Sequence, residues 1–148
     1  MRARDLAVPA PLIEPSQRLS DALRLLVSAG LPGLVVDLGH EYVVVPASQV
    51  LRVAVPTYVR DDPSLARVWD EASSDDLAST LAHLTVADLV DALERPSRTR
   101  TTAVDGDATL LEIAAVLSAA HVPLVAVVDN GRFLGVVSVN VIVDRLVG

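Results

Sequence analysis

The chain of 148 residues carries a formal net charge of −7 and is 51% hydrophobic but only 3% aromatic. The apolar fraction excludes a disordered chain, and the acidic balance argues against a nucleic-acid partner, which requires a basic surface. The chain contains no cysteine, which excludes disulfides, thiolate zinc sites and cysteine nucleophiles. No signal-peptide pattern follows Met1, and no apolar run reaches the ~20 residues of a membrane span. We therefore expect a cytoplasmic protein without direct membrane insertion.

Residues 1–55 have the pattern of one α/β unit. A short apolar strand ends in the turn Glu14-Pro15-Ser16, and leucines at helical spacing then predict a helix that a loop with Pro32 closes. The elements predicted after this loop are a buried strand at 34–36, a polar turn, a strand at 42–45 and a helix at 48–53.

Residues 56–84 predict a helical insert. Asp61-Asp62-Pro63-Ser64 has the pattern of a helix start, with Asp at the N-cap and Pro in the first turn. We expect Ser73-Ser74-Asp75-Asp76 to break this helix and to cap another one.

Residues 85–148 repeat the pattern of the first unit. Thr109 and Glu112 form a predicted capping box, His121-Val122-Pro123 closes the helix, and Asn130-Gly131 is a strong hairpin signal. The strands and final helix predicted here are 124–128, 133–137 and 140–146.

The two units align without a gap when residues 13–36 are written above residues 104–127, an offset of 91 with five identities in 24 positions. The shared order of strand, helix, strand, strand, helix predicts a parallel strand pair with a right-handed crossover and an added antiparallel strand. A half of this size cannot bury its own faces. We therefore predict an α/β (α+β) fold in which two β-α-β-β-α repeats pack sheet to sheet about a pseudo-twofold axis, with the helical insert between them.

Several stretches of the second copy carry a resemblance to a known family. They are Ala-Asp-Leu-Val at 87–90, Val-Asp-Gly-Asp-Ala-Thr-Leu-Leu-Glu at 104–112, His-Val-Pro-Leu-Val-Ala-Val-Val-Asp at 121–129 and Gly-Val-Val-Ser at 135–138. With Gly-Leu-Pro-Gly-Leu-Val-Val at 30–36 of the first copy, the chain resembles a tandem pair of CBS domains (a Bateman module). The resemblance implies a regulatory module that binds AMP, ADP, ATP or S-adenosylmethionine in the cleft between its repeats. It also implies a homodimer and a separate target protein, such as an enzyme, channel or transporter.

The resemblance also implies which residues hold the ligand. In the second copy they are Thr102, Ala103, Val104, Val122, Pro123 and Ser138; in the first they are Leu12, Ile13, Leu31, Pro32 and Gln49. The family pattern Gly-x-x-Thr/Ser-x-x-Asp keeps its hydroxyl at Ser138, but Val141 and Gln49 stand where the ribose-binding Asp is expected. Gln49 can still hydrogen-bond a ribose, and Asn140 lies one residue from the Asp position. Arg98 and Arg100 are either phosphate contacts or solvated loop charges.

Three hypotheses about function differ in class. The first is a ligand sensor, which the retained Ser138 and the proline loops favour. The second is a scaffold that keeps the fold but has lost the ligand, which Gln49 and Val141 favour. The third is an enzyme, and it ranks last because no motif carries a mechanism. His40, His83 and His121 share no metal-ligand spacing, so we predict no metal site.

Overall fold

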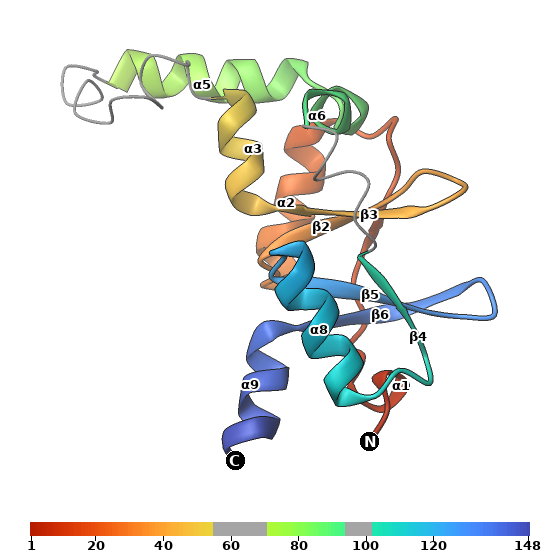
Figure 1. The fold of residues 1–148 in the computed structure, drawn as a ribbon. Helices are drawn as coiled ribbons and strands as arrows, with labels where there is room; N and C mark the ends of the chain where they lie inside the picture. The colour runs from red at the N-terminus through yellow and green to blue at the C-terminus, as the bar shows by residue number, and fades with distance from the viewer. Residues whose placement is uncertain (55–70, 94–101) are drawn as a thin grey trace.

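The computed structural model describes residues 1–54, 71–93 and 102–148 as a mixed α/β protein built from two three-stranded sheets (Figure 1). The helices described are α1 (Ala3–Leu6), α2 (Leu19–Ala29), α3 (Ala47–Ala54), α5 (Glu71–His83), α6 (Val86–Ala92), α8 (Leu110–Ala120) and α9 (Val139–Val147). The strands are β1 (Leu12–Ile13), β2 (Gly33–Asp37) and β3 (Tyr42–Pro46), then β4 (Ala103–Asp105), β5 (Leu124–Asp129) and β6 (Arg132–Ser138).

The two sheets have the same topology. In the first, β1 is parallel to β2 and β2 is antiparallel to β3; in the second, β4, β5 and β6 repeat this arrangement. The hairpin between β5 and β6 turns at Asn130 and Gly131, both with positive φ (52° and 77°), as the Asn-Gly signal predicts. The predicted fold class is therefore confirmed, including the parallel pair with its added antiparallel strand.

The sheets face one another through a shared apolar layer. Val35 and Val44 of the first sheet pack in one buried cluster with Ala126 and Val136 of the second. Val35 and Ala126 are related by the offset of 91 seen in the sequence, so corresponding positions of the two repeats meet at the interface. The rings of Tyr42 and Phe133, whose centroids lie 5.7 Å apart, also pair across this interface.

Each repeat also has a core of its own on the outer side of its sheet. Ile13, Leu19, Leu26 and Val36 lie in the first core, under α2, and Ile113 lies in the second, under α8. The burial pattern follows from the sequence, because the apolar residues at helical spacing turn one face of each helix to the sheet.

The helix that precedes each sheet packs against the other sheet. Ala3 and Leu6 of α1 lie in the core of the second repeat, whereas Leu89 and Val90 of α6 lie in the core of the first. Corresponding backbone hydrogen bonds hold the two helices: Ala3 N–H donates to the carbonyl of Ala108, 2.9 Å away, and Val86 N–H donates to that of Gln17, also at 2.9 Å. The two repeats are therefore interlocked.

The predicted insert differs from the structure at one point. Helix α5 begins at Glu71 and runs without interruption through residues 73–76, so the predicted break there is wrong. Serine and aspartate have only modest helix penalties, and neither forces a helix to end. The predicted helix start at Asp61–Ser64 lies outside the described residues. Within the described part of the chain, no helix is long and apolar enough to cross a membrane.

Candidate functional site

A cleft of about 520 Å³ lies between the two repeats. One side is the end of α2 and the loop after it; the other is the start of β5 and the junction of β6 with α9; Val8 closes a third side. The lining residues are Val8, Ala29, Gly30, Leu31, Pro32, Pro123, Ser138, Val139 and Asn140.

Helix ends hold the two main walls in place. Helix α2 ends at Gly30, whose φ of 65° allows the chain to turn sharply into Leu31 and Pro32. The carbonyl of Pro32 accepts from the N–H of Ala47 at 3.0 Å, and the carbonyl of Pro123 accepts from that of Val139 at 2.9 Å. These matching bonds join each proline loop to the first residue of the last helix of its own repeat.

The lining of the cleft is mostly apolar and includes a few hydrogen-bonding groups. Among the residues that the structure describes, none of the side chains lining the cleft is charged. Ser138 occupies the N-cap of α9, yet its side chain makes no capping hydrogen bond, so its hydroxyl remains able to bind a ligand. Asn140 adds an amide in the first turn of the same helix. The cleft therefore suits a largely apolar ligand that carries a polar group near the start of α9.

Four of the predicted binding residues meet in this cleft: Leu31 and Pro32 from the first repeat, with Pro123 and Ser138 from the second. Sequence reasoning grouped the residues by repeat, whereas the structure combines one proline loop with the serine of the other repeat.

The other predicted residues that the structure describes do not line this cleft. Ile13 is fully buried in the first core and Val104 is 8% exposed in the second, while Leu12, Ala103 and Val122 pack at the interface between the sheets. Thr102 is 3% exposed, and its hydroxyl accepts from the N–H of Val44 at 3.3 Å. The amide oxygen of Gln49 accepts from Arg52 at 3.4 Å on α3. Arg98 and Arg100 lie outside the described residues.

Sequence reasoning did not place Val8, Ala29, Gly30 or Val139 in the binding set. Gly30 and Val139 are next to the predicted residues Leu31 and Ser138, and Ala29 is two positions from Leu31, so the sequence pointed to their part of the chain. Val8 carried no such signal, because it reaches the cleft only by pairing antiparallel with Val136 of the other repeat. Val141, at the position of the family Asp, is half-buried against the second core. The described residues hold no cluster of His, Asp or Glu suited to a metal ion.

Two interlocked α/β repeats with a cleft between them define a paired-repeat binding fold. The CBS domain family model matches residues 86–148, the second repeat. A crystal structure of a CBS domain-containing protein of unknown function from Kribbella flavida is 38% identical, with 100% of this chain and 99% of that chain covered and a TM-score of 0.78. The chain therefore belongs to the CBS-domain proteins, as the resemblance predicted.

More distant structures share the fold. CBSX2 in complex with AMP is 23% identical, with 98% of this chain and 95% of that one covered and a TM-score of 0.62. A CBS domain-containing protein from Bacillus anthracis is 14% identical, with 99% and 92% covered and a TM-score of 0.67. The search of curated proteins found no match.

Proposed function

We propose that this protein is a non-catalytic regulatory module of the cytoplasm that senses an adenosyl ligand in the cleft between its two CBS repeats and acts on a separate target protein. The observation that carries the proposal is the cleft itself, in which apolar loops of both repeats meet Ser138. This serine is the N-cap residue of α9, and its hydroxyl makes no capping hydrogen bond. An adenine ring fits the apolar walls, and the Ser138 hydroxyl suits an oxygen of the ribose or phosphate. AMP, ADP, ATP and S-adenosylmethionine share this adenosyl part, and CBSX2 has been crystallised with AMP.

The substitution at the family Asp position lowers the expected affinity. Val141 supplies no carboxylate for ribose hydroxyls, and a hydrogen bond to a charged group is worth about 1.5–3 kcal/mol. Its loss corresponds to about one to two decades in the dissociation constant. We therefore expect weak binding, with Asn140 as the polar side chain nearest in sequence to this position.

Thermal unfolding with AMP, ADP, ATP, S-adenosylmethionine and NAD tests the proposal. A ligand at 100 times its dissociation constant adds about 2.7 kcal/mol to the free energy of unfolding, which raises Tm by about 2–4 °C or more at this length. Ser138→Ala should reduce the shift. Ala29→Trp should abolish it, because Ala29 is an exposed residue of α2 that lines the cleft. Ser28→Trp, which places the same ring on the neighbouring exposed residue outside the lining, is the matched control. A flat panel with the wild-type protein would contradict the proposal.

The second candidate is a scaffold that uses the CBS fold for association rather than for a ligand. Exposed apolar residues on the last helix of each repeat favour it: Leu51 on α3 is 59% exposed, and Val143 and Leu146 on α9 are 48% and 64% exposed. Val143 and Leu146 are three residues apart and so lie on one face of α9. Exposed apolar residues on one face are typical of an interface, and the partner we propose is a second copy of the chain. Sedimentation should give a dimer that Val143→Glu converts to monomer; a wild-type monomer at micromolar concentration would contradict self-association.

A further inference from the structure

The segment Arg2–Val8 belongs to the first repeat in sequence but is attached to the second. Arg4 N–H donates to the carbonyl of Gly106, 2.9 Å away, and Val8 exchanges two backbone hydrogen bonds with Val136, at 3.0 and 2.9 Å. We call residues 2–8 the strap. Its last residue, Val8, also lines the cleft, so the attachment of the strap completes that wall.

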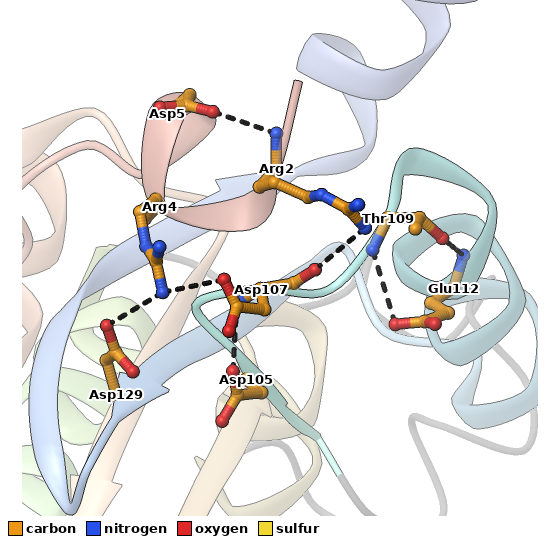
Figure 2. Close-up of polar contacts among 8 residues, drawn as sticks. All are labelled: Arg2, Arg4, Asp5, Asp105, Asp107, Thr109, Glu112 and Asp129. Atoms are coloured by element: carbon orange, nitrogen blue, oxygen red, sulfur yellow. Dashed lines mark hydrogen bonds and ion pairs between the residues drawn. The ribbon is translucent and has the colours of Figure 1, made fainter.

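Charged side chains reinforce this attachment. The guanidinium of Arg4 lies 2.8 Å from the carboxylate of Asp107 and 3.1 Å from that of Asp129 (Figure 2). Arg2 donates to the carbonyl of Asp107 at 3.2 Å. The side chains of Arg4, Asp107 and Asp129 are 43%, 72% and 29% exposed, so water and salt reach both ion pairs, the one with Asp129 less freely. We call the Arg4, Asp107 and Asp129 side chains the clasp.

The clasp has no counterpart at the corresponding positions of the other half. Helix α6 is attached to the first repeat as the strap is to the second, and there Ala87 N–H donates to the carbonyl of Pro15 in the place of Arg4 and Gly106. The offset of 91 puts Ser16 at the position of Asp107 and Leu38 at that of Asp129. Repeat symmetry thus explains the backbone contacts of Ala3 and Arg4 but not the charges of the strap.

Burial also differs between the two attachments. Helix α1 buries Ala3 and Leu6, whereas α6 buries the larger set Val86, Leu89 and Val90. The strap therefore depends more on exposed polar contacts, which open at lower free energy than packed apolar ones.

We propose that the strap is a hinged wall that controls access to the cleft and that the clasp sets how often it opens. Val8 separates from Val136 in the open state, which uncovers the edge of β6 that ends at Ser138. The role of this gate in sensing rests on the proposed function; the opening itself does not.

Two readouts test the gate without a ligand. The first is hydrogen exchange at the Ala3, Arg4 and Val8 amides. The second is the rate at which iodoacetamide modifies the thiol of Ser138→Cys, which is the sole thiol because the chain has no cysteine. Arg4→Ala should accelerate both by about twofold to thirtyfold, from the loss of two exposed ion pairs. Arg24→Ala is the matched control, because it removes an exposed ion pair with Asp21 (2.8 Å) from α2 without touching the strap.

Salt and a second variant separate the clasp from a general loss of structure. Raising ionic strength from about 0.05 to 0.5 M should accelerate both readouts in the wild-type background but not with Arg4→Ala, since screening removes the same ion pairs. In a background that already carries Asp107→Asn and Asp129→Asn, Arg4→Ala should accelerate amide exchange and thiol modification less than it does in the wild type. The amide of Val127 in the central strand should exchange at the wild-type rate throughout.

Two results would overturn the proposal. One is wild-type exchange at Val8 in Arg4→Ala. The other is faster exchange at Val8 with no change in thiol modification, which would mean that the strap opens without widening the cleft. Failure of the whole ligand panel to bind would contradict the proposed function and leave both of these readouts decisive.

Discussion

Helices α1 and α6 occupy corresponding places and are held in different ways. The third residue of each helix, Asp5 in α1 and Asp88 in α6, is an aspartate whose carboxylate accepts from the backbone N–H of the N-cap residue at 2.9 Å. Only α6 completes the capping box, because the Thr85 hydroxyl accepts from Asp88 N–H, whereas the arginine at the N-cap of α1 has no acceptor. Because α6 is more deeply buried and fully capped, we expect it to stay attached to its sheet. Because α1 is held partly by the exposed ion pairs of the clasp, we expect its attachment to weaken as ionic strength rises.

The largest expected difference between α1 and α6 is in the free energy of unfolding that is lost when the core leucine of each helix is truncated. Leu6 and Leu89 stand at corresponding positions of α1 and α6 and are 6% and 0% exposed. Leu-to-Ala changes in cores cost about 2–5 kcal/mol, more where the site cannot collapse. We expect Leu89→Ala near the upper end and Leu6→Ala near the lower end in urea unfolding. Equal losses would show that α1 is as firmly packed as α6.

A glycine fixes the path of the strap. A Cβ on Gly135 would overlap the carbonyl oxygen of Val8, and the φ of this residue is +149°. Gly135→Ala should therefore cost about 1–3 kcal/mol and detach Val8, with faster exchange of its amide. Gly39→Ala is the control, because its φ is also positive (+90°) but no atom lies within 4 Å of its Cβ. An equal cost for the two variants would mean that contact with Val8 contributes nothing.

Truncating the N-cap residues of α6 and α1 should change the free energy of unfolding by smaller amounts than the core and glycine variants do. Thr85→Ala removes a side-chain hydrogen bond of 3.2 Å to Asp88 N–H and should cost about 1 kcal/mol. Arg2→Ala removes no cap bond, only the exposed hydrogen bond of 3.2 Å to the carbonyl of Asp107, and should cost less. Chemical denaturation of both variants against the wild type measures the difference, and a larger loss for Arg2→Ala would contradict our account of the caps.

The fold was predictable because its signals are local. Leucines at helical spacing, the capping box of Thr109 and the Asn130-Gly131 turn each predict their own element, and the repeat then gives the topology. The set of residues that line the cleft was harder to predict from the sequence, because Leu31 and Ser138 belong to different repeats and meet only when the two repeats pack together. Nothing in the sequence of Val8 indicates that it crosses to β6. The division into 1–55, 56–84 and 85–148 stays a prediction, and the exchange of α1 and α6 shows that such boundaries do not separate the cores.

The smallest expected effect comes from building a clasp on the other side. Ala87→Arg with Ser16→Asp places the charges of Arg4 and Asp107 at the corresponding positions of α6 and the turn before α2. Because Ser16 is exposed and Ala87 half-buried, the new pair should be worth only about 0.2–1 kcal/mol. A double-mutant cycle in urea at low salt isolates this coupling from the cost of each single change. The coupling should vanish at high salt, while the exchange rates of the α6 amides change little, because Leu89 and its buried neighbours already hold the helix. A coupling well above this range would show that the positions of Ala87 and Ser16 shield an ion pair from solvent more than their exposure indicates, and would contradict our account of how little an exposed pair contributes.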